Sequence, residues 1–191
     1  MVVSHHAALR CWVIPEEGDV VTLHLPAVEV WTVDAIKDLP PELRYELHDG
    51  SLLIMSPARF WHQEIERRIC NLLRAANRIA SQQVGVLNTV RDTRVPDVAV
   101  FNAEPEDWDV TWHLAAAIAL VVEVWSPGSD GKDRDTQWYA ERGIPGYWLA
   151  EPIEGDKKNA LITMHELKAD ANTYVVTSQA TLAELEERGL S

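Results

Sequence analysis

Two acidic residues stand where the chain is otherwise apolar. Asp97 directly precedes an apolar run in TRVPDVAVF, residues 93–101, and Glu123 lies inside a second run, IALVVEVWSP, residues 118–127. An ionised carboxylate is costly to bury unless it is paired, hydrogen-bonded or bound to a cation. An Asp that opens one strand and a Glu inside the next can meet across a sheet, and such a pair suits Mg²⁺ or Mn²⁺. The pattern therefore predicts a divalent-cation site.

Each acid also has a purely structural interpretation. Glu123 on an exposed edge strand would need no partner, and Pro-Asp is common turn chemistry at the start of a strand. Against the first alternative, Glu123 shares its strand face with Val121 and Trp125, while valines occupy the other face. We therefore expect this strand to be covered on both sides.

The elements that must position these acids are predicted from periodicity and turn residues. RYELHDGSLLIMSP predicts a hairpin that turns at Asp49-Gly50, and Thr32 followed by VDAIKDL predicts a short capped helix. Apolar residues at steps of three and four predict a helix over residues 58–80, with one buried stripe: Ile65, Ile69, Leu72, Ala76 and Ile79. Arg67, Arg74 and Arg78 fall on the opposite side, as a solvated face or as a ridge that contacts phosphates.

The rest of the chain predicts a central sheet and further helices. Four short apolar runs, VGVLNT, PDVAVF, IALVVEVW and GYWLAEP, are bounded by Pro, Gly or Asp and predict strands, with a helix over residues 133–142 before the last. NALITMHELK and TYVVTSQ predict a further pair of strands, and residues 181–188 a terminal helix. The predicted class is α/β (α+β).

Length and composition limit the classes of function. The chain has 191 residues, for which we expect one domain over residues 27–191 after a loosely docked arm over residues 1–26. Thirty acidic against 17 basic residues give a net charge of −13, which argues against charge-driven coating of nucleic acid but leaves room for an acidic nuclease with bound cations. No apolar run is long enough for a membrane span, and no secretory signal is recognisable, so we expect a cytoplasmic protein.

Five motifs together resemble a known family. RYELHDGSLLIMSP, His62, VPDVAVF, LVVEVWSPGS and YAERGIPGYWLAEP occur in the order seen in the "putative restriction endonuclease" family, also called the Uma family, of the PD-(D/E)XK nuclease superfamily. The resemblance runs from about Thr32 to Pro152. It implies a restriction-endonuclease-like core, in which helices flank a central mixed β-sheet, with an N-terminal hairpin and a metal site at the centre of the sheet.

The resemblance also implies roles for individual residues. Asp97 and Glu123 would be the metal-binding carboxylates, with the carbonyl of Val124 as a further ligand. Glu46 would be the third acid, although a solvent-facing position on the hairpin is an equal alternative. His62 matches a histidine at the start of the helix in many relatives, and a lone histidine there is more often a capping or packing residue.

The superfamily's lysine is missing from its usual places. Trp125 stands two residues after Glu123, and Asp135 stands four residues before Tyr139, where relatives of this family carry the lysine. An amine there would help to deprotonate the attacking water and offset the charge of the transition state. Lys132 is the nearest candidate, with a solvated loop lysine as its alternative.

Two functions follow as expectations. The first is a Mg²⁺- or Mn²⁺-dependent DNA endonuclease that uses Asp97, Glu123, Glu46 and Lys132, with Arg67, Arg74 or Arg78 on the DNA backbone. The second is a catalytically inactive binding or assembly module that keeps the acids as a vestige. The resemblance implies a homodimer in either case.

Overall fold

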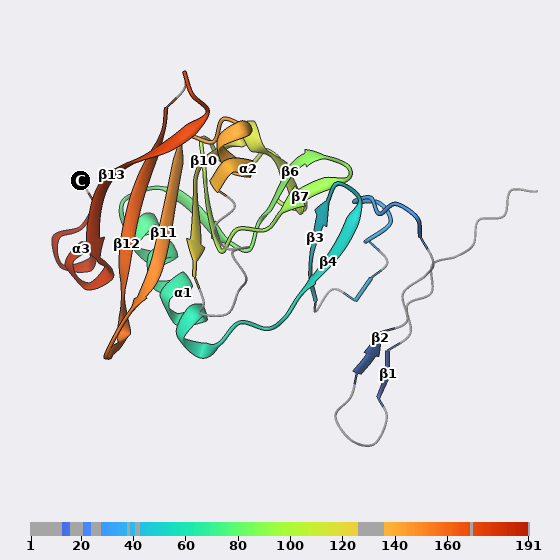
Figure 1. Ribbon diagram of the computed structural model, residues 1–191, viewed down its shortest axis with the longest axis horizontal. Coiled ribbons are helices and arrows are strands. Elements are labelled where there is room, and N and C mark those ends of the chain that lie inside the picture. The colour runs from blue at the N-terminus through green and yellow to red at the C-terminus, as the bar shows by residue number, and fades with distance from the viewer. Residues whose placement is uncertain are drawn as a thin grey trace, which may run out of the picture. The chain divides into compact units, whose positions relative to one another are not determined.

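The structure is a computed structural model that describes residues 13–15, 21–23, 28–37, 39–40, 43–125, 136–168 and 170–190 (Figure 1). It contains two compact units. The smaller unit comprises Met1–Ser56 with Thr89–Thr93, and the larger unit comprises Pro57–Asn88 with Arg94–Ser191. Most of the arm predicted over residues 1–26 lies outside the described residues, and the single domain over residues 27–191 stays a prediction.

The smaller unit contains two antiparallel hairpins. β1 (Val13–Pro15) pairs with β2 (Val21–Leu23), and β3 (Arg44–His48) pairs with β4 (Ser51–Met55). The turn of the second hairpin is Asp49-Gly50, with φ of 49° and 87°, and two positive φ angles are what a two-residue type I′ turn requires. The predicted hairpin is confirmed. The helix predicted after Thr32 is wrong, because residues 33–37 form a turn in which Ala35 N donates to Thr32 Oγ1 over 3.3 Å.

A six-stranded mixed sheet forms the centre of the larger unit, in the order β13-β12-β11-β10-β8-β5 (Figure 1). Its strands are β5 (Ile79–Gln82), β8 (Val98–Phe101), β10 (Ile118–Val124), β11 (Gly146–Ile153), β12 (Asp156–Lys168) and β13 (Thr173–Thr181). Among these pairs β10 and β11 are parallel and all others antiparallel. β6 (Gly85–Thr89) pairs in parallel with β9 (Trp112–Leu114), which precedes the 3-10 helix η1 (Ala115–Ala117), and β7 (Asp92–Arg94) follows β6.

Alternate residues of the sheet enter two apolar clusters. Val98 and Val100 of β8 belong to the cluster completed by helices α1 (Phe60–Ala75) and α3 (Leu182–Arg188). Ala99 and Phe101 belong to the second cluster, which contains residues of α2 (Thr136–Glu141). Because successive side chains of a strand point to opposite faces, helices cover both faces of the sheet. The predicted fold class, a central mixed sheet flanked by helices, is confirmed.

Helix α1 ends earlier than periodicity predicts. Asn77 adopts φ 58°, Asn77 N donates to Arg74 O over 3.0 Å, and Arg78 N donates to Leu73 O over 3.0 Å. This is the hydrogen-bond pattern of a Schellman C-cap, in which Asn is the usual substitute for Gly. The prediction of a helix over residues 58–80 is therefore wrong after Ala75, and Ile79 begins β5 instead.

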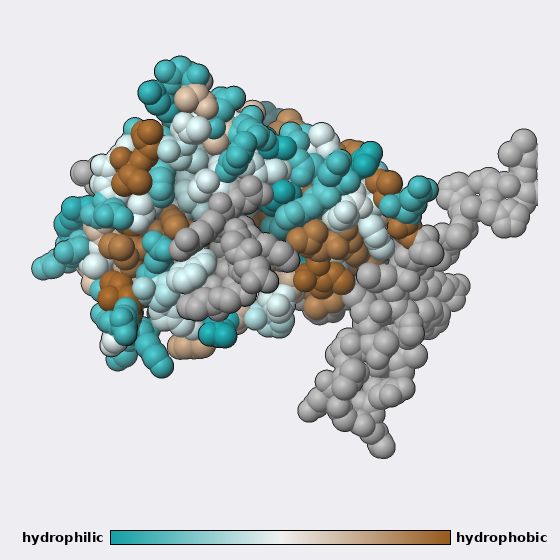
Figure 2. Space-filling view, in the orientation of Figure 1, coloured by the Kyte–Doolittle hydropathy of each residue, from teal (hydrophilic) through white to brown (hydrophobic). Residues whose placement is uncertain are grey.

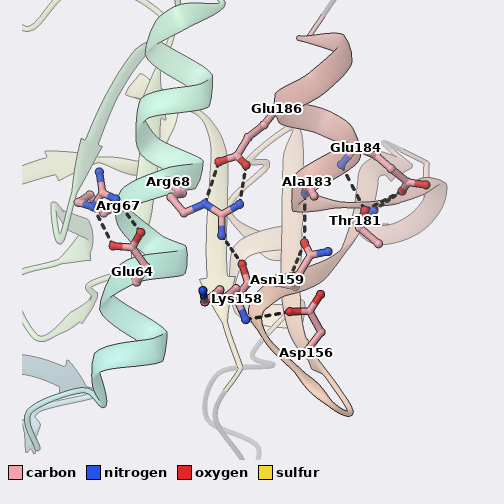
Figure 3. Close-up of polar contacts among 11 residues, drawn as sticks. Glu64, Arg67, Arg68, Asp156, Lys158, Asn159, Thr181, Ala183, Glu184 and Glu186 are labelled. Atoms are coloured by element: carbon pink, nitrogen blue, oxygen red, sulfur yellow. Dashed lines mark hydrogen bonds and ion pairs between the residues drawn. The ribbon is translucent and has the colours of Figure 1, made fainter.

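Helix α3 is capped at its start and joined to α1 by an ion pair (Figure 3). Thr181 and Glu184 form a capping box, with Thr181 N to Glu184 Oε2 at 2.7 Å. Arg68 of α1 donates to both carboxylate oxygens of Glu186, over 2.8 and 2.5 Å, and also to the carbonyl of Lys158. These contacts fix α3 against α1 and β12.

The surface shown in Figure 2 is mostly hydrophilic, with scattered apolar patches. No helix in the described part of the chain combines the length and the apolar character that crossing a membrane requires.

Candidate metal centre

Asp97 lies directly before β8 and is 4% exposed. Its Oδ2 accepts a hydrogen bond of 2.7 Å from Val124 N, at the end of β10. β8 and β10 are antiparallel neighbours, with Val98 opposite Val122. One step further along the same register sets Asp97 opposite Glu123, so the two acids that the sequence singled out belong to neighbouring segments of one sheet.

Helix α1 brings two further side chains to Asp97. His62 Nε2 lies 2.9 Å from Asp97 Oδ1. His62 and Glu66 are four residues apart on the helix and therefore face the same way. One ligand atom from each of His62, Glu66 and Asp97 lies within 4.8 Å of the other two, and all three residues are buried. We call this group the His-Glu-Asp cluster.

Gln83 links two members of this cluster. Its backbone N donates to Asp97 O over 3.0 Å, and its side-chain Nε2 lies 3.5 Å from Glu66 Oε2. Gln83 adopts φ 54°, the left-handed conformation, in the loop that follows β5. The loop therefore fixes the backbone at Asp97 and presents an amide donor to Glu66.

Glu123 is half-buried, and its carboxylate has a partner from another element. Tyr139 OH of α2 donates to Glu123 Oε1 over 2.6 Å, and Tyr139 is 2% exposed. Next to it, the Trp138 ring faces two guanidinium groups, with Arg94 Cζ at 4.7 Å and Arg142 Cζ at 4.3 Å from its centroid. The packing around Trp138 and Tyr139 thus holds α2 in a position from which the Tyr139 hydroxyl can orient Glu123.

Val124 is fully buried at the end of β10, opposite Ala150 in the parallel register with β11. Its N–H is bound to Asp97, so the peptide groups at Val124 lie beside the carboxylate. The metal-ligand role of its carbonyl stays a prediction.

The other residues named from the sequence lie in different places. Glu46 is on β3 in the smaller unit, 8% exposed, with His48 Nε2 at 2.9 Å from its Oε2. Its role as a third acid stays a prediction. Lys132 lies outside the described residues.

The three arginines differ in their contacts. Arg67 is exposed and paired with Glu64, with Arg67 Nη2 at 2.6 Å from Glu64 Oε1. The hydrogen bonds between the two side chains raise the pKa of Arg67 and lower the pKa of Glu64. Arg74 Nε donates to Ala80 O over 2.8 Å. Arg78 follows the helix and lines a cavity described below. Their contact with DNA stays a prediction.

Glu66 and Tyr139 are candidate site residues that no sequence pattern singled out. Glu66 is 1% exposed although it is charged, and its spacing of four residues from His62 was the available signal. Tyr139 belonged to a quoted motif, but no local pattern links it to Glu123, which is 16 residues away.

The His-Glu-Asp cluster supplies one imidazole nitrogen and two carboxylates. Two acids with one histidine form a donor set that accommodates Mn²⁺, whereas Mg²⁺ favours a shell made wholly of oxygen. A cation would also compensate the buried charge of Glu66 and Asp97. The residues present therefore fit a divalent metal ion.

A mixed sheet with helices on both faces is an arrangement that this chain shares with a solved structure. A crystal structure of a "putative nuclease belonging to DUF820" from Anabaena variabilis ATCC 29413 shares this fold, with a TM-score of 0.55 and 18% identity over 78% of this chain and 83% of the other. The family model Uma2, described as "Putative restriction endonuclease", matches residues 33–187. The chain belongs to this family. Among curated proteins, none matches it.

Proposed function

We propose that the larger unit hydrolyses phosphodiester bonds of DNA with Mg²⁺ or Mn²⁺, as an endonuclease of the PD-(D/E)XK type. The observation that carries this proposal is the buried carboxylate of Asp97, which lies between His62 on one side and the Val124 peptide on the other. Membership of the Uma2 family supports it.

Asp97, Glu123 and the carbonyl of Val124 are the proposed ligands, and Glu66 is a further carboxylate within reach of Asp97. A divalent cation held there would polarise the scissile phosphate and lower the pKa of a water molecule for in-line attack. The chain's own contribution is to hold the carboxylates in place. Val124 N–H and Gln83 restrain Asp97 and its loop, and Tyr139 restrains Glu123.

His62 is proposed as a positioning residue. Its Nε2 lies 2.9 Å from Asp97 Oδ1, so the imidazole ring packs against this carboxylate oxygen and restrains it. A neutral imidazole can instead offer Nε2 to a cation, which makes the occupancy of the cluster dependent on pH.

The amine of the superfamily is proposed to be Lys132. It would orient the attacking water and offset negative charge on the phosphate, roles that an arginine fills only in part because a guanidinium does not act as a base at neutral pH.

A catalytically inactive binding module is the second candidate, and Asp135 favours it. This residue stands four residues before Tyr139, where relatives of the family carry the lysine. Both candidates are proposed to act as homodimers, which sedimentation velocity would detect as twice the mass of the chain.

A cleavage assay separates the two candidates. Supercoiled plasmid and labelled duplex oligonucleotides are incubated with Mg²⁺ or Mn²⁺ and with wild type, Asp97→Asn, Glu123→Gln or Lys132→Met. The endonuclease proposal predicts cleavage by wild type and a loss of about a hundredfold or more in each variant, because each removes a group that acts on the transition state. Glu154→Gln is the matched control, since Glu154 is an exposed acid of the larger unit in the turn between β11 and β12. Cleavage that survives unchanged in Asp97→Asn and Glu123→Gln would refute the proposed site, and DNA binding without cleavage by wild type would favour the inactive module.

A further inference from the structure

A second candidate site lies away from the acids. The larger unit has a solvent-open cavity of about 700 Å³ at the end of the sheet where β10 and β11 begin, next to Leu120 and Gly146. Glu123 and Val124 stand at the other end of β10. Leu120 and Val124 are four positions apart on this strand, which is roughly 13 Å at about 3.3 Å per residue. The cavity volume falls within the usual range of small-molecule sites, about 300–1,000 Å³.

The floor of this cavity is apolar and partly aromatic. Trp148 of β11 and Met164 of β12 are directly opposed across the antiparallel pair, and both pack against the cluster that contains α1 and α3. Ser178 of β13 lies beside them, with its Oγ 3.1 Å from Met164 Sδ. Trp148 is only half-buried, so part of its indole is available to a flat ligand.

Two arginines stand on the rim of the cavity. Arg78 lies two residues after Ala76, the C-cap of α1, and Arg188 is the last residue of α3. Both are exposed, and within the described residues neither guanidinium takes part in a hydrogen bond or a close ion pair. Other arginines of this unit do have such partners, as Arg68 has in Glu186. In a chain of net charge −13, two such cations at one cavity provide charge complementarity to an anion.

We propose that this cavity binds one unstacked nucleotide. Guanidinium groups match the oxygens of a phosphate in two-point hydrogen bonds, and an indole offers a platform on which any base can stack. Ser178 and the carboxylate of Glu166, which also lines the cavity, supply groups for the donors of the sugar and the base. The choice of a nucleotide over other flat anions rests on the proposed function.

Two kinds of ligand present a phosphate, a sugar and an unstacked base in this way. One is a free mononucleotide, and the other is an unpaired nucleotide at a single-stranded end of DNA. The experiment therefore uses dAMP and a short single-stranded oligonucleotide as separate probes. Deoxyadenosine, which lacks the phosphate, and ribose 5-phosphate, which lacks the base, are the partial ligands.

The test measures binding by calorimetry, without divalent metal, to wild type and to Arg78→Gln/Arg188→Gln. We expect dAMP to bind wild type and the double variant to lose about tenfold or more in affinity, because hydrogen bonds to charged groups are among the strong ones. Arg59→Gln/Lys157→Gln removes the same charge from exposed positions of the larger unit and should bind like wild type. Tighter binding of the oligonucleotide than of dAMP would identify a DNA end as the source, and the reverse order a free nucleotide.

Deoxyadenosine and ribose 5-phosphate should both bind more weakly than dAMP. Trp148→Leu should weaken the binding of dAMP while leaving that of ribose 5-phosphate unchanged, with thermal unfolding as a check that the variant is folded. Absence of binding by both nucleotide probes, or equal binding by the two double variants, would overturn the proposal. Asp97→Asn separates it from the proposed catalysis: cleavage should be lost and dAMP binding retained. Cleavage by a wild type that binds neither probe would leave the proposed function intact and refute the cavity.

Discussion

His62 Nε2 of helix α1 lies 2.9 Å from Asp97 Oδ1, at the residue that precedes strand β8. This contact joins α1, the helix with the clearest apolar periodicity, to Asp97, the acid that precedes the first of the two apolar runs. Glu66, one turn further along α1, brings a second carboxylate to the same point.

Replacing Glu66 should affect the metal-free and metal-bound forms in opposite directions. Glu66→Gln removes a buried negative charge beside Asp97, so we expect the metal-free protein to be more resistant to urea. The same change should weaken Mn²⁺ binding about tenfold or more, because a ligand is lost. Urea unfolding with and without Mn²⁺ measures both effects through the stabilisation that a bound ligand provides. Exposed Glu154→Gln is the control, and a Glu66→Gln variant that Mn²⁺ stabilises as strongly as wild type would contradict this role for Glu66.

Tyr139→Phe tests the orientation of Glu123. The change removes one hydroxyl and its hydrogen bond of 2.6 Å to Glu123 Oε1, while the ring stays between Trp138 and Tyr147. We expect a loss of about 1.5–3 kcal/mol, as for hydrogen bonds to charged groups, in the free energy of unfolding. If the endonuclease proposal holds, kcat should fall with little change in KM. Tyr174→Phe is the matched control, since Tyr174 OH donates to the carbonyl of Ile144 instead of an acid.

The ion pair of Arg68 and Glu186 should make stability depend on pH in the acid range. Its hydrogen bonds to Arg68 hold the pKa of Glu186 below the ordinary value of 4.5. A carboxyl whose pKa is lowered by folding contributes stability above its unfolded pKa and loses it as pH falls through its folded pKa. The free energy of unfolding of wild type should therefore exceed that of Glu186→Gln by about 0.5–1 kcal/mol at pH 7, a value reduced for solvent screening. This difference should vanish in strong acid. Urea unfolding at pH 7, 5 and 3 measures it, and a difference that grows as pH falls would contradict the pairing.

Cys70 should be unreactive in the folded protein. It is 1% exposed, and burial raises the pKa of its thiol. Since the thiolate is the reactive form, alkylation by iodoacetamide at pH 7.5 should require unfolding. In a Cys11→Ser background, mass spectrometry should find Cys70 unlabelled in buffer and fully labelled in urea. Rapid labelling in buffer would show that the packing around α1 opens easily.

Local sequence signals predicted several elements well. Asp49-Gly50 is a pair that suits a type I′ turn, and the terminal helix predicted over residues 181–188 corresponds to α3. These signals succeed because the residues that determine the structure are neighbours in sequence. The end of α1 shows the limit: periodicity ran on to Ile79, whereas the local conformation of Asn77 stopped the helix.

The candidate site was only partly predictable for a related reason. Asp97 and Glu123 stood out because each interrupts an apolar run, and the resemblance to a family named both. Glu66 lies one position from the buried stripe at Ile65, where a charged residue is ordinarily assigned to the solvent side. Its burial depends on Asp97 and Gln83, which approach from other elements. When the partners of a buried ionisable residue are distant in sequence, the residues next to it do not indicate that it is buried.

The parallel pairing of β10 with β11 has a consequence for the order of folding. The strands β11, β12 and β13 are consecutive antiparallel neighbours, so their contacts close short loops. Joining β10 to β11 requires the whole crossover of residues 125–145, and closing a longer loop costs more entropy before any contact compensates it. Tyr139 lies in that crossover and Glu123 on β10. We therefore expect the Tyr139 hydroxyl to reach Glu123 only after the C-terminal strands have formed, so that a newly made chain folds this part of the sheet before it orients the acid.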